Sequence, residues 1–214
     1  FELDMRAGTT AYAGFPFFED MASKRANRWL AARDKSYYGS ILHFMRSIYT
    51  DSLIENGFEV HRMVRNYNME KERIRDFYKP FAGRDSTLSE DSFRYYQAVM
   101  RQKDYTDRYY NELLTGDSLV MNAQEGFKQL YFPNFLYIVY KNETENQLYL
   151  SHNYSGRKPM YQSSHLFLVN NEPILIDANG NHYPAQELFS IGYWGWSEKI
   201  AEMLPLDYVP GNYK

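Results

Sequence analysis

The chain has 214 residues, of which 44% are hydrophobic, 24% charged and 18% aromatic, and its formal net charge is -3. This composition is that of a globular protein, and the slight excess of acid argues against nucleic acid as the main partner, because phosphate binding needs a basic surface. The absence of cysteine excludes disulfides, thiolate nucleophiles and cysteine-ligated zinc or iron–sulfur sites.

The 21 tyrosines are the unusual feature of this composition. Tyrosine combines a large apolar ring with a hydroxyl group that needs a partner or water, so we expect polar-edged cores, interfaces or carbohydrate-binding surfaces. No apolar run approaches the roughly 18 residues of a membrane-spanning helix, so we expect a chain that does not span a membrane. The chain starts at Phe1 without a signal peptide, which predicts a mature or excised part of a longer protein.

The first helical patterns lie before residue 57. Residues 1–18 predict an extended segment that enters a larger sheet, and residues 20–33 predict an amphipathic helix with a basic outer face. Ser40 is a suitable N-cap for a helix that continues to Glu55, where Asn56-Gly57 provides a stop.

The next segment mixes helical and extended patterns. Residues 58–65 favour a strand and 66–68 a turn, while helices are expected at 70–78 and 90–102, on either side of a break at Pro80-Phe81-Ala82-Gly83. The pattern of residues 105–114 fits a helix or a strand, and the sequence does not decide between them.

After Gly116 the apolar segments become short and rich in aromatic or β-branched residues, which is typical of strands. The strands are expected at 119–120, 135–140, 148–150, 165–169 and 173–176. Residues 170–172 and 178–181 are suitable hairpin turns, because Asn and Gly tolerate positive φ. A short helix over 197–204, stopped by Pro205, ends the pattern.

Together these patterns predict an α+β fold. We expect a helix-rich region with a short N-terminal strand over residues 1–115, followed by a mostly antiparallel, strand-rich region with a short final helix over residues 116–214. Whether the two regions share one core stays open at this point.

Common catalytic and metal-binding motifs are absent from the sequence. The five histidines never stand at a zinc-ligand spacing, and no nucleophile elbow, P-loop or dinucleotide-binding fingerprint occurs. Ser155-Gly156-Arg157-Lys158 matches the S-x-x-K of penicillin-recognising enzymes only formally, because Gly156 and Pro159 predict a loop and no K-T-G follows. We therefore predict no catalytic residue, no metal site and no cofactor.

Ser40, His43 and Arg46 form the first candidate binding group. Their spacing places them along one side of the start of the Ser40 helix, where they could grip an anion or a carboxylate of a partner. The alternative is structural: Ser40 caps the helix, His43 satisfies a local backbone group or a tyrosine hydroxyl, and Arg46 pairs with an acid.

Tyr193, Trp194 and Trp196 form the second candidate group, between Gly192 and the final helix. Exposed aromatic side chains bind sugars, flat ligands and proline-rich peptides, whereas a pair of aromatic residues that precedes a helix can equally fill a core. The exposure of the two indoles decides between these interpretations.

Several segments together resemble a known group of sequences. They are Arg28-Trp29, residues 37–46, residues 56–60 and the ending Gly192-Tyr193-Trp194-Gly195-Trp196 with residues 197–208. They are similar to the C-terminal region of uncharacterised envelope proteins of the Bacteroidota labelled carboxypeptidase-like regulatory domain-containing, over most of residues 12–208. In that family a signal peptide and a small non-catalytic β-sandwich precede this region. The resemblance implies an exported protein, periplasmic or associated with the outer membrane, and assigns no catalytic residue.

Our leading hypothesis from the sequence is a non-enzymatic module of the cell envelope that binds another protein, as an accessory to a periplasmic or outer-membrane complex. Exposed tyrosines and the Trp194/Trp196 region would supply its contact surface. A glycan-binding module that uses exposed Trp and Tyr is the alternative. A hydrolase of unknown type built on His43 is the third hypothesis.

Overall fold

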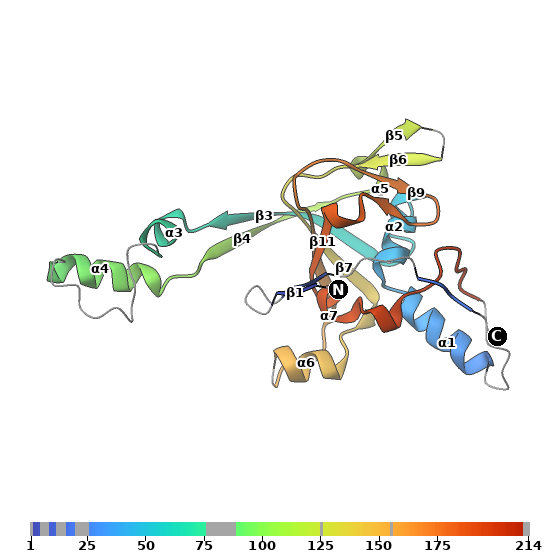
Figure 1. The fold of residues 1–214 in the computed structure, drawn as a ribbon, viewed down its shortest axis with the longest axis horizontal. Coiled ribbons are helices and arrows are strands. Elements are labelled where there is room, and N and C mark those ends of the chain that lie inside the picture. Colours follow the sequence, from blue (N-terminus) through green and yellow to red (C-terminus); the bar gives the residue numbers. More distant parts are fainter. Residues whose placement is uncertain are drawn as a thin grey trace.

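The computed structural model describes residues 2–4, 9–11, 16–19, 26–75, 89–124, 126–154 and 156–211. Within these ranges the fold is α+β, as the sequence predicts (Figure 1). The α-helices are α1 (Ala26–Tyr37), α2 (Ile41–Tyr49), α3 (Met69–Arg75), α4 (Glu90–Met100), α5 (Gly116–Leu119), α6 (Gln147–Asn153) and α7 (Tyr193–Ser197), with short 3-10 helices at Ala185–Glu187 and Ile200–Glu202.

The strands are all paired antiparallel, in three sheets. The strands are β1 (Glu2–Asp4), β2 (Thr9–Ala11), β3 (Phe58–Tyr67), β4 (Tyr105–Leu113), β5 (Val120–Gln124), β6 (Phe127–Leu130), β7 (Phe135–Thr144), β8 (Tyr161–Leu168), β9 (Ile174–Asp177), β10 (His182–Tyr183) and β11 (Leu188–Gly192). The largest sheet has the order β11-β8-β7-β3-β4, a smaller one the order β10-β9-β6-β5, and β1 pairs with β2 alone. The described strands of the N-terminal segment, β1 and β2, therefore do not enter a larger sheet, contrary to the expectation from the sequence.

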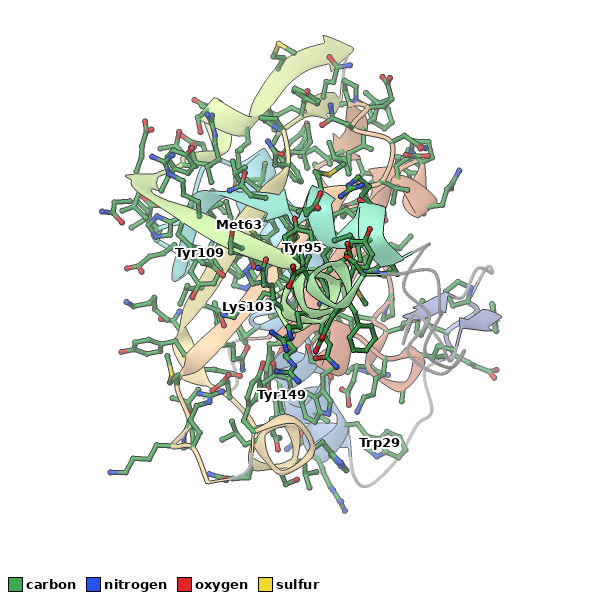
Figure 2. All side chains as sticks on the ribbon, turned by 90° about the vertical axis from the view of Figure 1, so that its left-hand side faces the viewer. Trp29, Met63, Tyr95, Lys103, Tyr109 and Tyr149 are labelled. Atoms are coloured by element: carbon green, nitrogen blue, oxygen red, sulfur yellow. The ribbon has the colours of Figure 1, made fainter. Side chains whose placement is uncertain are left out.

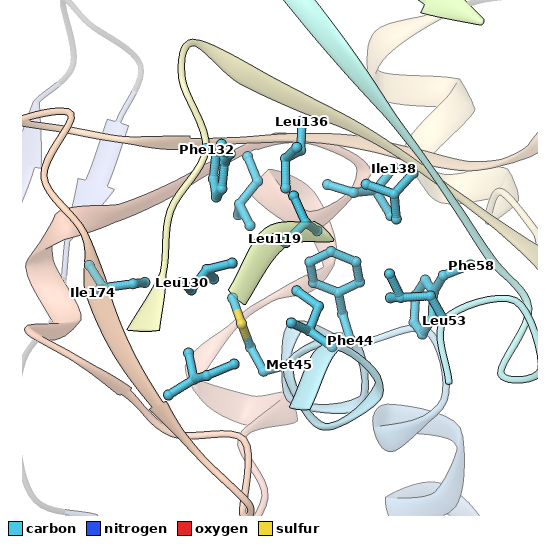
Figure 3. Close-up of a cluster of buried hydrophobic side chains, with 14 of the residues drawn as sticks. Phe44, Met45, Leu53, Phe58, Leu119, Leu130, Phe132, Leu136, Ile138 and Ile174 are labelled. Atoms are coloured by element: carbon cyan, nitrogen blue, oxygen red, sulfur yellow. The ribbon is translucent and has the colours of Figure 1, made fainter. Parts of the chain in front are cut away.

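One buried cluster lies between the two larger sheets and α2 (Figure 3). The α2 side chains Phe44, Met45 and Ile48 meet side chains of β3, β6, β7, β8 and β9, and Trp194 of α7 joins them. Members of this cluster come from both sides of residue 115, because α2 and β3 lie before it and β6, β7, β8 and β9 lie after it. We call this part of the molecule the body.

Helix α2 begins as the sequence predicts but ends earlier. The Ser40 side chain accepts a hydrogen bond from the His43 backbone N–H, which is an N-cap. The helix ends at Tyr49 rather than Glu55. Asp51 has a φ of 50°, which an α-helix cannot contain, and its carboxylate accepts a hydrogen bond from the Asp117 N–H. This contact with the start of α5 replaces the last turns of the expected helix.

Strands β3 and β4 extend beyond the sheet and carry two helices at their far end (Figure 1). Pairing of β3 with β7 stops at Met63, whereas its pairing with β4 continues to Tyr67. We call the projecting part, residues 64–75 and 89–108, the arm. The expected turn at 66–68 is wrong, because Asn66 and Tyr67 continue the strand, and Asn68 instead accepts a hydrogen bond from the Lys71 N–H at the start of α3.

Later elements confirm some predictions and correct others. The expected strand at 148–150 is helix α6, because the Asn146 side chain caps it. Residues 178–181 form the hairpin turn between β9 and β10, as predicted, whereas residues 170–172 link β8 to β9 in different sheets. The helix expected over 197–204 is reduced to a 3-10 helix at Ile200–Glu202, because α7 starts at Tyr193 and already ends at Ser197. The expected break at 80–83 lies outside the described residues.

Among the described helices, none combines the length and the apolar character that a membrane crossing requires.

Candidate functional site

Ser40 and His43 lie inside the body, where they organise the start of α2. The Ser40 hydroxyl donates to the Tyr37 carbonyl at 2.6 Å, and His43 Nδ1 accepts from the Gly39 N–H at 3.2 Å. The His43 ring is 4% exposed and packs against the rings of Tyr37 and Phe58. The side-chain positions of Ser40 and His43 therefore support the structural interpretation of this group rather than a surface site.

Burial also sets the protonation state of His43. It lowers the pKa of the imidazole to about 4, a hydrogen bond with Asn56 opposes this shift, and the positive charge of Arg46 adds to it. The imidazole is therefore neutral near pH 7. Its partners among the described residues are a backbone amide, an asparagine and aromatic rings, and none of them is a carboxylate.

Arg46 points away from His43 and holds the C-terminal segment against α2. Its guanidinium donates to three backbone carbonyls, those of Asn179 at 2.9 Å, Leu206 at 3.0 Å and Tyr208 at 2.6 Å. The Tyr208 hydroxyl in turn donates to Asp34 at 2.6 Å. A guanidinium engaged in this way is a structural clamp, so Ser40, His43 and Arg46 do not converge on a common ligand position.

The aromatic group near the C-terminus divides between two environments. Trp194 is 3% exposed, and its indole N–H donates to the Gly39 carbonyl at 2.7 Å while its ring packs on Phe44. Tyr193 is buried in a second cluster with Tyr149 and Leu150 of α6, and Trp196 packs half-buried against it. Lys199 lies 4.5 Å from the centre of the Trp196 ring. Trp194 therefore fills the core, and Trp196 is the indole that reaches the surface.

The arm carries several exposed aromatic side chains. Tyr67 is 59% exposed, Tyr95 49% and Tyr105 41%, and Met69 is 68% exposed. Figure 2 views the molecule from the end of the arm and labels Tyr95 and Lys103 there. These side chains come from β3, α3, α4 and β4, so the tertiary structure gathers residues that are far apart in the sequence.

Ion pairs and hydrogen bonds stiffen this arm. Arg65 makes two hydrogen bonds of 2.8 Å to the Asp107 carboxylate across β3 and β4, and its guanidinium lies 3.8 Å from the centre of the Tyr105 ring. Both partners are mostly buried, which favours a fixed geometry. The ion pair lowers the pKa of Asp107, mainly through the hydrogen bond from Arg65. At the tip, the Tyr95 hydroxyl donates to Glu70 at 2.7 Å and so joins α4 to α3.

The sheet face opposite the core holds the base of the arm. The Tyr109 hydroxyl lies 3.3 Å from His165 Nε2, and Tyr137 packs against both rings. Burial lowers the pKa of His165, and the charge of Arg65 adds to this shift while Asp107 opposes it. The ring contacts join β4 to β7 and β8, so the arm leaves the body from a packed base.

An open hollow of about 520 Å³ lies beside this base. Its walls combine apolar and aromatic side chains with nearly as much polar surface, and its charged side chain is Arg65, which hydrogen-bonds to Asp107. The lining residues are Arg65, Tyr67, Pro133, Asn134, Phe135, Phe167, Leu168, Val169, Asn171 and Ile191. No group of three or more metal-ligating side chains lies together in the part of the chain that the structure describes. The hollow therefore offers contact area more than reactive groups.

Sequence reasoning missed the arm as a site. The high tyrosine content predicted polar-edged cores, interfaces or carbohydrate-binding surfaces without locating them, and residues 105–114 gave no decision between helix and strand. The signal that could have located it is alternation: Tyr105, Asp107 and Tyr109 lie on one face of β4, and Thr106, Arg108 and Tyr110 lie on the other. Such a polar, two-faced strand is expected at an exposed edge.

Comparison with protein-family models, with curated proteins and with solved structures found no match to this chain. A function for this chain is therefore inferred from the geometry of the molecule.

Proposed function

We propose that this chain is a non-enzymatic protein-binding module of the cell envelope, accessory to a periplasmic or outer-membrane complex, and that the arm is the element that contacts the partner.

The observation that carries this proposal is the exposure of Tyr67, Met69, Tyr95 and Tyr105 on a braced projection. Tyrosine, methionine and arginine are enriched at protein interfaces, because they provide large contact areas with a few directed polar contacts. A stiff element loses little conformational entropy on binding, so more of the contact energy contributes to affinity. The arm combines both properties.

The location in the envelope rests on a different kind of support. It comes from the resemblance of residues 37–46, 56–60 and 192–208 to the C-terminal region of Bacteroidota envelope proteins. In this chain these segments form the start of α2, the start of β3 and the segment from α7 to Tyr208. They build the body rather than the arm, so the resemblance bears on location more than on the contact surface.

A glycan-binding function has weaker support. A sugar ring needs an exposed aromatic face for stacking, and Trp194 has its indole in the core. Trp196 is half-buried and has Lys199 over its ring. We expect soluble polysaccharides to leave the tryptophan fluorescence unchanged, and quenching that disappears in Trp196→Phe would favour the glycan alternative instead.

A hydrolase built on His43 is supported least, since the imidazole is 4% exposed and its surroundings hold it neutral. Substrate would have no access to this ring without opening the core.

The experiment that tests the proposal removes the arm and keeps the body. Val64 and Arg108 face each other across β3 and β4, so an Asn-Gly turn can join them directly in place of residues 65–107. The core cluster lies entirely outside the deleted range, and we therefore expect the shortened chain to fold. The full chain, tagged and recovered from its native envelope in mild detergent, should retain a stoichiometric partner that the shortened chain does not retain.

Two matched double variants test whether partner binding depends on tyrosines of the arm or on exposed tyrosines anywhere in the chain. Tyr67→Ser with Tyr105→Ser removes exposed rings from the arm, and Tyr161→Ser with Tyr183→Ser removes rings of similar exposure from the body. We expect the first pair to weaken partner recovery and the second to leave it unchanged. Equal recovery by the full and the shortened chain would rule out the arm as the contact element.

A further inference from the structure

Strand β4 lies at the edge of the five-stranded sheet. It pairs with β3 on one side, and no described strand pairs with its other side. Along its nine residues every side chain is exposed except that of Asp107, which is partly buried by Arg65. Natural proteins usually shorten, cover or bend such an edge, because its free N–H and C=O groups can pair with another chain. In β4 the irregular pairing is confined to the segment between Tyr109 and Leu113.

The pairing register identifies the backbone groups that face outward. The Asn68 N–H donates to the Asp104 carbonyl at 2.8 Å, which marks this position as a hydrogen-bonded pair in the β3–β4 register. Hydrogen-bonded and non-hydrogen-bonded pairs alternate in antiparallel strands. Thr106 and Arg108 therefore direct their N–H and C=O groups toward β3, whereas Tyr105, Asp107 and Tyr109 direct theirs outward.

We propose that the outer edge of β4 receives an extended segment of the partner protein as a sixth strand of the sheet. This inference rests on the proposed function, since it specifies how the arm binds its partner. The outward groups of Tyr105, Asp107 and Tyr109 supply the main-chain hydrogen bonds. Arg65 and Asp107 hold β4 on β3 and so fix the edge before the partner arrives.

The side chains of β4 define the chemistry of that segment. Tyr105 and Tyr109 lie on one face, where aromatic or β-branched residues are the favoured cross-strand neighbours. On the other face Arg108 is exposed, stacks on the Tyr110 ring at 5.2 Å and has no ion pair among the described residues. It would stand in a non-hydrogen-bonded pair with the new strand, where opposite side chains come closest. An acidic residue is the complementary neighbour at that position.

Nearby charges favour the same segment. Arg101 and Lys103 are exposed just before β4, and neither takes part in an ion pair within the described ranges. Asp104 and Asp107, in contrast, are neutralised by Lys71, Arg75 and Arg65. The available charge beside Tyr105 is therefore positive, and the occupant is an acidic extended segment with alternating aromatic or β-branched residues.

A second copy of this chain fits the edge less well. A two-fold antiparallel pairing of β4 with itself must place one residue opposite its own copy. In the regular part of the strand, residues 105–109, the register that uses all five positions centres on Asp107, and the two registers shifted by one residue centre on Thr106 and Arg108. The registers centred on Asp107 and Arg108 place like charges opposite each other, which destabilises the pairing. The register centred on Thr106 avoids this but engages only three of the five positions. A different protein is therefore the better occupant.

The experiment compares two variants that both lose the same ring, of which only one also loses an outward N–H. Tyr109→Pro lacks the N–H at an edge position where proline is tolerated, and Tyr109→Ala lacks the same ring but keeps the N–H. With the tagged full-length chain in detergent-solubilised native envelope, we expect Tyr109→Pro to recover about tenfold less partner than Tyr109→Ala. Both variants lose the ring contacts with Tyr137 and His165, so equal unfolding temperatures of the two variants show that the proline itself leaves the sheet intact.

Photocrosslinking provides a readout that does not depend on the proline variant. Benzoylphenylalanine at Thr106 should crosslink to a partner peptide that carries acidic and β-branched or aromatic residues in alternation. The same crosslinker at Leu148, which is 63% exposed on α6, is the control and should not reach that peptide. Equal recovery by the proline and alanine variants, crosslinks to a helical partner segment, or crosslinks to a second copy would each overturn strand addition.

The two proposals fail differently in this experiment. If the tip of the arm captures the partner while Tyr109→Pro has no effect, protein binding by the arm stands and strand addition falls. If the full chain retains no partner, both fall together.

Discussion

The body and the arm of this molecule are built by different forces. In the body, side chains from both larger sheets and α2 are removed from water together, and Phe44, Met45 and Ile48 are fully buried. In the described part of the arm, Ile74 and Val99 are the buried apolar side chains, and ion pairs and hydrogen bonds join its strands and helices. Hydrophobic burial therefore specifies the body, whereas paired polar groups hold the arm out in solvent with its aromatic rings exposed.

This difference separates stability from recognition. A buried cluster tolerates little change, because lost contacts leave cavities that the surroundings fill only in part. Exposed aromatic side chains on the arm can be substituted with little loss of folding stability, so they can be selected for binding. Damage to the body should unfold the whole chain, and damage to the arm should stay local.

The largest expected effect comes from Phe44→Ala in the body. Phe44 is fully buried and its ring contacts those of Phe58 and Trp194, so the substitution opens a cavity where α2, β3 and α7 meet. We expect the free energy of unfolding to fall by about 3–5 kcal/mol. Urea denaturation followed by tryptophan fluorescence measures it, with Phe44→Leu as the milder control. A loss below about 1 kcal/mol would contradict the assignment of this cluster as the core.

Ile74→Ala makes the equivalent cavity in the arm, and we expect its destabilising effect to stay within the arm. Ile74 is fully buried in α3, which packs against α4 at the tip. We expect about 2–4 kcal/mol of local destabilisation, seen as faster amide hydrogen exchange in α3 and α4. The amides of α2 and β7 should exchange at the wild-type rate. Faster exchange throughout the body would show that arm and body unfold as one unit.

The start of α2 should give the body a measurable pH dependence. The folded pKa of His43 is about 4, below its ordinary value of 6.5, so the unfolded state binds the proton first as pH falls. The resulting stability is complete above pH 6.5 and is lost as pH drops through 4, by about 3 kcal/mol. Comparing wild type with His43→Gln by urea denaturation at several pH values isolates this loss. Parallel pH profiles for the two proteins would contradict it.

Glu198 should shift stability in the opposite direction. Burial raises the pKa of its carboxyl to about 7, although the hydrogen bond from the Ile41 N–H opposes the shift. The folded state therefore holds the proton longer than the unfolded state, and stability falls as pH rises from about 4.5 through 7. We expect the free energy of unfolding of Glu198→Gln to rise relative to that of the wild type as pH increases over this interval. A constant difference between the two proteins across it would exclude the shift.

The elements that could be predicted from the sequence are those with a local physical cause. The Ser40 cap, the strand at Phe58 and the turn at Gly180 each follow from one or two residues with strong conformational preferences. The α+β class follows from the change in apolar pattern after Gly116. The end of α2 could not be predicted, because the contact that stops it joins Asp51 to Asp117, far away in the chain.

The candidate site was less predictable than the fold. Ser40, His43 and Arg46 have the right types for binding, but His43 is buried against rings from β3 and β7. Tyr105 and Tyr109 become part of an exposed edge only because β4 is the last strand of the sheet and pairs with β3 on one side. Exposure of this kind is a property of the strand order in the assembled sheet, and no single segment contains it.

The smallest expected effect concerns the brace between β3 and β4 in the arm, which is the Arg65–Asp107 ion pair. Arg65→Gln removes a charge from a mostly buried bidentate pair and leaves the Asp107 carboxylate without its partner, which should destabilise the arm by about 1–3 kcal/mol. Because the brace lies beyond Met63, where β3 no longer pairs with β7, hydrogen exchange should quicken in residues 64–67 and 105–108 and stay unchanged in β8. Arg65→Lys keeps the charge but loses the two-pronged geometry, so an intermediate effect is expected. If Arg65→Gln instead lowered the unfolding temperature of the whole chain, the arm would be part of the same cooperative unit as the core, and recognition and stability would not be separated in this molecule.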